Sequence, residues 1–237
     1  MEIIGYSERG AMNALFYGIA LKNDENAMKA FLNLACIENY EGYHDFKLYM
    51  EFSLSEFGSP DLVFTAKDKN EQKTVFFVEA KASCGKEYNK EVQFDHHNDY
   101  ITEGKFDNGH ASNLFFQLRL KNYFYNECCP EGDKKKKDEL PMQIRESRGQ
   151  DRKLGENPIV LKFKDELNKD LYNDKYIAII PKQQEGKPRP DNLYGFKIHY
   201  VTWEEINEIF EKYVGKTIEF NQNEGGVSQI LNNRLVK

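Results

Sequence analysis

The amino-acid sequence predicts an α/β domain in which a central mixed β-sheet is flanked by helices. Segments with apolar residues at helical spacing alternate with short runs rich in β-branched and aromatic residues. The run YIAIIP at 176–181 is continuously apolar, which is typical of a strand buried on both faces. The chain of 237 residues is long enough for one sizeable core. We therefore expect a single domain that spans residues 1–237.

The first third of the chain predicts two helices followed by three strands. The first helix begins near Ser7 or Glu8, and the second follows Asp24, which is a typical N-cap residue. The residues that follow form extended patterns at 47–54, 61–66 and 74–81. Three consecutive strands are the simplest interpretation.

The remaining elements alternate with two long polar excursions, at about 83–111 and 128–158. Between them, an amphipathic helix capped by Ser112 or Asn113 is expected to pack on the sheet. After the second excursion come strands at 176–181 and 195–202, and a helix with Thr202 as its N-cap. The run DHHND at 95–99 is interpreted as a solvated loop rather than a metal site, because adjacent residues of an extended segment point apart.

Composition and net charge narrow the expected location of the protein and the ligands that it can bind. No stretch reaches the roughly 18 apolar residues that a spanning helix needs, so a membrane location is not expected. The four cysteines have no paired spacing, which favours a reducing cytoplasmic compartment. The net charge of -6 is unlike that of a strong nonspecific nucleic-acid binder. The basic stretch at 134–153 is interpreted either as a flank for a polynucleotide or as a solvated loop.

Two of the predicted strands bring acidic residues together. If 61–66 and 74–81 form an antiparallel hairpin that turns near Asn70, Asp61 lies opposite Glu79, with Cβ atoms roughly 5 Å apart. Lys81 shares the face of Glu79 because side chains alternate along a strand. Opposed carboxylates repel each other, so a cation is expected between them, and Mg²⁺ favours such oxygen ligands.

Pro60-Asp61 followed by Glu79-Ala80-Lys81 on the next strand resembles the signature of the PD-(D/E)xK nuclease superfamily. The resemblance implies a restriction-endonuclease-like core with long insertions at about 83–111 and 128–158. It implies that Asp61, Glu79 and the Ala80 carbonyl hold Mg²⁺ or Mn²⁺. It further implies that Lys81 positions or activates the attacking water and stabilises the charged transition state.

The resemblance also suggests supporting residues. Glu8 on the first helix resembles a glutamate that completes metal binding in many members; alternatively, it only complements the helix N-terminus. Gln117 on the helix after the E-x-K strand matches a polar residue that faces the site, with Lys121 and Tyr123 as weaker candidates for contacts to phosphate or base. The alternative for these three is plain exposure to solvent.

The expected function is hydrolysis of phosphodiester bonds in DNA, and the sequence leaves RNA open as an alternative substrate. A homodimer or a partner subunit that delivers the substrate is compatible with the acidic net charge. The rival interpretation is a catalytically inactive module of the same fold that binds nucleic acid or a protein partner. In that case Glu79 and Lys81 are an ordinary charged pair, although their apolar neighbours disfavour an exposed edge strand.

Overall fold

The computed structural model describes residues 8–50, 52–81, 90–103, 112–128, 140–169, 172–181, 192–193, 195–214, 217–223 and 227–234. The helices are α1 (Glu8–Lys22), α2 (Glu25–Leu34), α3 (Lys90–Glu103), α4 (Leu114–Cys128), α5 (Met142–Arg145), α6 (Pro158–Lys169) and α7 (Trp203–Ile209). The strands are β1 (His44–Tyr49), β2 (Leu62–Lys67), β3 (Lys73–Ala80), β4 (Glu146–Ser147), β5 (Gln150–Asp151), β6 (Tyr172–Ile180), β7 (Asn192–Leu193), β8 (Phe196–Thr202), β9 (Thr217–Asn223) and β10 (Val227–Arg234).

The fold is α/β, as predicted, with a mixed six-stranded sheet in the order β1-β2-β3-β6-β8-β7. The first three strands form an antiparallel meander. Strands β3, β6 and β8 then run parallel, and β7 pairs antiparallel with β8 at the edge. The run 176–181 was predicted to be a buried strand, and residues 176–180 lie in β6, between β3 and β8.

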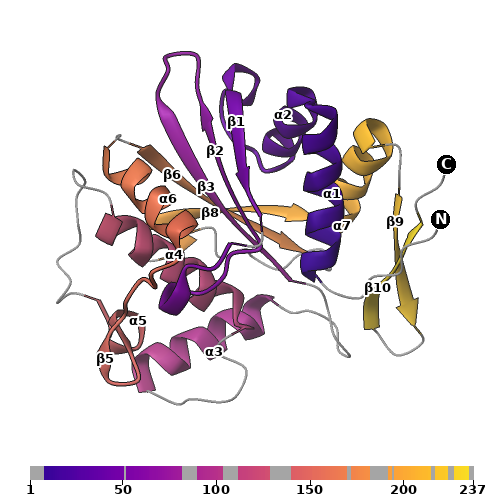
Figure 1. Ribbon diagram of the computed structural model, residues 1–237. Helices are drawn as coiled ribbons and strands as arrows, with labels where there is room; N and C mark the ends of the chain where they lie inside the picture. The colour runs from indigo at the N-terminus through magenta and orange to yellow at the C-terminus, as the bar shows by residue number, and fades with distance from the viewer. Residues whose placement is uncertain are drawn as a thin grey trace.

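Helices cover both faces of the sheet (Figure 1). On one face, α1, α2 and α7 pack over the even-numbered residues of β3, such as Phe76 and Val78. On the other face, α4 and α6 pack over the odd-numbered residues, such as Val75 and Phe77. This alternation follows from the two-residue period of a strand, and it gives the domain two apolar layers. The expected packing of the helix at 114–128 on the sheet is confirmed.

Local capping explains where several helices begin. Asp24 Oδ1 accepts a hydrogen bond of 2.9 Å from the Asn26 N–H at the start of α2. Asn113 Oδ1 accepts bonds of 3.0 and 3.1 Å from the first-turn N–H groups of α4, which confirms one of its two predicted caps. At α7, Glu205 Oε2 accepts from the Thr202 N–H at 2.8 Å, and the Glu205 N–H donates to Thr202 Oγ1 at 3.3 Å. Such reciprocal bonds satisfy the N–H groups that a helix leaves without partners.

Two local predictions were wrong. Strand β1 ends at Tyr49, whereas the sequence pattern extended the strand to residue 54. The DHHND run, predicted to be a solvated loop, lies in helix α3. His97 is fully buried there, and its ring lies close to those of Phe94 and Phe115. The helical period brings His97 and Tyr100 to the same inward face of α3. The sequence prediction treated the segment as extended, and in an extended segment these two side chains would not share a face.

The described part of the second excursion is held against the core. Ile144 of α5 is fully buried, and the Arg152 guanidinium donates to the carbonyls of Ile144 at 2.7 Å, of Gln143 at 3.0 Å and of Glu56. Arg152 also lies over the Phe116 ring at 5.8 Å. This arginine therefore fastens the segment to the domain, while residues 134–139 of the basic stretch lie outside the described residues.

The C-terminal hairpin of β9 and β10 had no counterpart in the sequence prediction. It forms a separate two-stranded sheet, and β10 contacts α1 (Figure 1). A short π-helical turn, Phe210–Val214, connects α7 to this region. Among the helices in the described part of the chain, none combines the length and apolar character needed to cross a membrane.

Candidate functional site

The register of the β2–β3 hairpin brings Asp61 and Glu79 to the same end of the sheet. Leu62 pairs with Val78 and Val63 with Phe77, so one further step sets Asp61 opposite Glu79. Val63 and Phe77 belong to the apolar layer beneath α4, and strand alternation places Asp61, Glu79 and Lys81 on that face too. The register is the one expected from the turn near Asn70.

Hydrogen bonds fix the main chain around these residues. Asp61 Oδ2 accepts a bond of 2.7 Å from the Ala80 N–H, which ties the acid before β2 to the end of β3. The Lys81 N–H donates to the Ile179 carbonyl at 2.8 Å, and the Lys81 carbonyl accepts from Trp203 Nε1 at 3.0 Å. Lys81 is thereby held on both sides of its Cα by neighbouring elements, although it lies beyond the last residue of β3.

Glu79 is surrounded by two ammonium groups. The Glu79 side chain is 2% exposed, and its Oε1 lies 2.7 Å from Lys121 Nζ. Lys81 Nζ lies 4.0 Å from the other oxygen, Oε2. The closer contact is an ion pair whose angles fall outside those of a hydrogen bond, so among the described residues Oε1 has no aligned donor. The charge of the carboxylate is therefore balanced by the two ammonium groups.

Lys121 reaches Glu79 from α4 and is fully buried. Burial lowers the pKa of its ammonium group, and the charge of Glu79 opposes this lowering. Lys121 Nζ also donates to Gln117 Oε1, one helical turn earlier. Lys121 was a weaker candidate for a contact to phosphate or base, and the alternative, plain exposure to solvent, is wrong because its side chain is fully buried. This lysine is part of the charge balance at the strand ends.

Gly58 allows this lysine and glutamine to come close to the backbone. Its φ of +84° lies in the region that glycine adopts readily, and a Cβ there would be 2.4 Å from Gln117 Oε1 and 2.8 Å from Lys121 Nζ. Both distances are too short for real atoms. The turn before Asp61 therefore requires glycine for two separate reasons, conformation and space.

The donor set is compatible with a hard divalent cation. Mg²⁺ in proteins is commonly held by one or two carboxylates together with waters and substrate phosphates. Asp61 and Glu79 supply two carboxylates on one face, and Glu79 Oε1 is a buried oxygen without an aligned donor among the described residues. Within the part of the chain that is described, no group of three or more His, Cys, Asp or Glu side chains has a metal-holding arrangement.

The other predicted residues differ in their placement. Glu8 is the first residue of α1, and its side chain lies outside the described residues. Gln117 is half-buried and lies within the site through its bond to Lys121. Tyr123 is buried, with its ring 5.5 Å from that of Phe57, so it is a core residue rather than an exposed contact.

Two residues that support the site were not identified as such from the sequence. Gly58 was not among the predicted site residues, although a glycine just before Ser-Pro-Asp is a common signal for a turn with unusual backbone angles. Trp203 was assigned to the apolar face of its helix, which is correct, but its indole N–H also anchors Lys81. That bond joins residues 122 positions apart, so no local sequence pattern predicts it.

Comparisons with known proteins gave no significant match to a protein-family model, to a curated protein sequence or to a solved structure.

Proposed function

We propose that the protein is a metal-dependent nuclease of the PD-(D/E)xK superfamily that hydrolyses phosphodiester bonds in DNA. The observation that carries the proposal is the placement of Asp61, Glu79 and Lys81 on one sheet face at the end of the β2–β3 hairpin. Opposed carboxylates repel each other and their burial is costly, so a function that needs them would explain why they are gathered here. The mixed sheet with helices on both faces is compatible with a restriction-endonuclease-like core.

In this proposal each residue has a distinct role. Asp61, Glu79 and the Ala80 carbonyl would hold Mg²⁺ or Mn²⁺, and Glu8 remains the proposed additional acidic ligand. When bound, the ion would polarise the phosphoryl oxygen and lower the pKa of a coordinated water. Lys81, fixed by its main chain, would orient the attacking water and stabilise charge on the phosphoryl oxygens. Gln117 would hold Lys121 in position behind Glu79.

A cleavage assay tests the proposal. Duplex DNA, single-stranded DNA and RNA would each be incubated with the protein in Mg²⁺, Mn²⁺ or a chelator. We expect metal-dependent cleavage of DNA that falls by about 100-fold or more in Asp61→Ala and Lys81→Ala, as when electrostatic stabilisation of a transition state is removed. Asp165→Asn, which changes an exposed carboxylate on α6, serves as the matched control. Undiminished cleavage by either site variant would refute the assignment.

A second candidate is supported by the Lys121–Glu79 ion pair. Because the buried ammonium group of Lys121 already balances the charge of Glu79, the folded protein can hold Asp61 and Glu79 at this position without a metal. This favours a non-catalytic module that binds nucleic acid or a protein partner. Calorimetric titration with Mn²⁺ separates the two candidates. The nuclease should bind the ion and lose that binding in Asp61→Asn, whereas the module should show no binding that depends on Asp61 or Glu79.

A further inference from the structure

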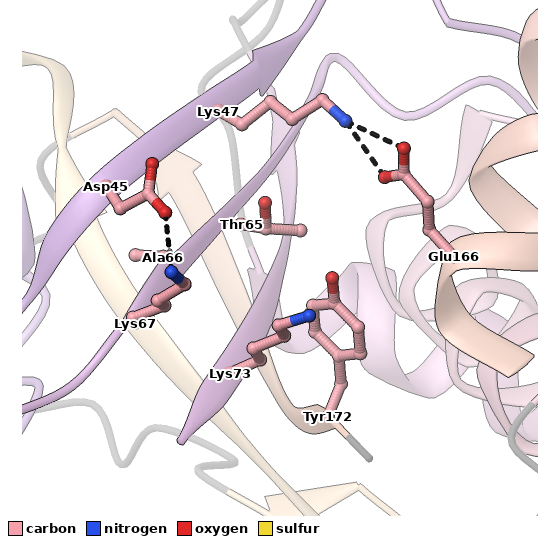
Figure 2. A pocket seen from close by; sticks show the side chains of 8 residues that line it. All are labelled: Asp45, Lys47, Thr65, Ala66, Lys67, Lys73, Glu166 and Tyr172. Atoms are coloured by element: carbon pink, nitrogen blue, oxygen red, sulfur yellow. Dashed lines mark hydrogen bonds and ion pairs between the residues drawn. The ribbon is translucent and has the colours of Figure 1, made fainter. Parts of the chain in front are cut away.

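The ion pair between Lys121 and Glu79 lies in the interior of the domain. Lys121 Nζ is 2.7 Å from Glu79 Oε1, and the two side chains are 0% and 2% exposed. By contrast, the Lys47–Glu166 pair, which lines a pocket beside the β2–β3 turn (Figure 2), has side chains that are 52% and 29% exposed. Water and salt screen an exposed pair strongly and a buried pair much less. The charge of Lys121 therefore acts on Glu79 with little screening.

Neighbouring groups hold the Lys121 ammonium group in place. Its Nζ donates to Gln117 Oε1, one turn earlier on α4. A Cβ at Gly58 would lie 2.8 Å from the same Nζ, so the backbone of the turn before Asp61 lies directly beside the ammonium group. Lys121 is therefore a fixed internal cation, unlike a lysine on the surface, whose long side chain moves freely in water.

Lys81 adds a second positive charge beside Glu79. Its Nζ lies 4.0 Å from Glu79 Oε2, so each oxygen of this carboxylate faces an ammonium group. The carboxylates of Glu79 and Asp61 attract the Lys121 ammonium group, and the Lys81 ammonium group repels it. Both of these carboxylates are proposed metal ligands. A bound metal ion and Lys121 would therefore draw on the same negative charge.

A divalent cation at Asp61 and Glu79 would meet this positive charge at close range. Mg²⁺ lies about 2.1 Å from its oxygen ligands, so an ion on either oxygen of Glu79 would be within a few ångströms of Lys121 or Lys81. Like charges at such a separation repel each other strongly where water is largely excluded. The two ammonium groups therefore oppose binding of the metal alone, and further negative charge that arrives with the metal would relieve this opposition.

We propose that Lys121 is an internal counter-cation that makes metal binding at Asp61 and Glu79 depend on the phosphodiester substrate. Each phosphodiester group carries one negative charge, which offsets the charge that the metal adds beside Lys121 and Lys81. Metal and substrate then bind with positive cooperativity, and each raises the affinity of the protein for the other by the same factor. This role rests on the proposed nuclease function, because it requires Glu79 to be a metal ligand.

A purely structural role for Lys121 makes a different prediction. If the lysine only balances a buried carboxylate, its removal lowers the stability of the fold. It does not change how strongly metal binding depends on the substrate. The readout that separates the two roles is therefore the effect of substrate on metal affinity, rather than stability or cleavage.

Isothermal titration calorimetry on the full chain measures this effect. Mn²⁺ is titrated into the protein alone, with a phosphorothioate DNA duplex, which keeps the negative charge of the backbone, and with a methylphosphonate duplex, whose backbone is uncharged. Titrations of Mn²⁺ into each duplex alone are subtracted. We expect the Mn²⁺ affinity of the wild type to rise by about tenfold or more with the phosphorothioate duplex. The methylphosphonate duplex should leave it unchanged.

Lys121→Met removes the internal cation. This variant should bind Mn²⁺ about tenfold or more tightly than the wild type in the absence of DNA, and the phosphorothioate duplex should then add little. Lys162→Met, which changes an exposed lysine of α6, is the matched control and should behave like the wild type. Circular dichroism shows whether each variant folds. If Lys121→Met does not fold, the wild-type titration and its reciprocal, duplex binding with and without Mn²⁺, still decide the question because they need no variant.

The possible outcomes separate this inference from the proposed function. Equal Mn²⁺ affinity of the wild type with and without the phosphorothioate duplex overturns the inference and leaves the nuclease proposal standing. The same holds if folded Lys121→Met binds Mn²⁺ no more tightly than the wild type. If neither the wild type nor Lys121→Met shows Mn²⁺ binding that Asp61→Asn abolishes, with or without the duplex, the nuclease proposal itself is overturned, and the inference with it.

Discussion

The buried Lys121–Glu79 pair makes a sharp prediction about stability. Lys121→Met removes the ammonium but nearly preserves the shape of the side chain, and it leaves a carboxylate that is 2% exposed. The remaining cation, Lys81, is 4.0 Å from the other oxygen of Glu79. Removing one partner of a buried pair costs about 3–5 kcal/mol, because the remaining charge is left uncompensated. Since Lys81 stays nearby, we expect a loss close to the lower end, about 3 kcal/mol.

Urea and thermal unfolding measure this loss. For a chain of this size each kcal/mol shifts the melting temperature by about 2–4 °C, so Lys121→Met should melt about 6–12 °C lower. The double variant Lys121→Met with Glu79→Gln should regain much of the loss, because no unpaired charge then remains. Lys162→Met, on the exposed surface of α6, is the control and should change stability by less than about 0.5 kcal/mol.

A metal titration extends the same experiment. If Glu79 is a metal ligand, Mn²⁺ should stabilise Lys121→Met more than the wild type, because the competing ammonium is gone. At a concentration 100 times the dissociation constant, a bound ion adds about 2.7 kcal/mol to the free energy of unfolding. A loss below about 1 kcal/mol in the single variant would refute the reasoning, since it would show that Glu79 does not depend on Lys121 for its charge balance.

Three further predictions concern single positions. Gly58→Ala should reduce the free energy of unfolding by about 1–3 kcal/mol, because the new Cβ meets Gln117 and Lys121 and the residue keeps a positive φ; chemical denaturation measures this, and an unchanged midpoint would contradict the described turn. Burial lowers the pKa of His199 below its usual value of 6.5. Stability from this histidine should therefore be fully present above about pH 6.5 and be lost as the pH falls through the folded pKa, by up to about 1.4 kcal/mol per pH unit. Unfolding of the wild type and His199→Gln between pH 5 and 8 tests this, and parallel pH profiles would count against it. Asn113→Ala should cost about 1 kcal/mol through loss of the α4 cap, measured by the same denaturation assay, and no effect would show that the cap bonds are not formed.

Local features of the fold could be predicted from the sequence because their causes are local. The β2–β3 register follows from a turn near Asn70 and from side-chain alternation, and it brings Asp61 opposite Glu79. The caps of α2 and α7 depend on residues within one turn of the helix start. Helix α3 was missed because most of its residues are polar, and His97 becomes buried only when the helix packs against the rest of the domain, for example against Phe115 of α4.

The sequence by itself determined the α/β class, the hairpin and the face shared by Asp61, Glu79 and Lys81, since strand periodicity and turn position require nothing distant. Only the tertiary structure decided that Lys121 is buried against Glu79 and that Trp203 anchors Lys81. It also decided that Lys47 meets Glu166 across 119 positions of sequence. Each of these contacts depends on how helices dock on the sheet, and docking is set by the packing of whole elements rather than by the spacing of residues along one of them.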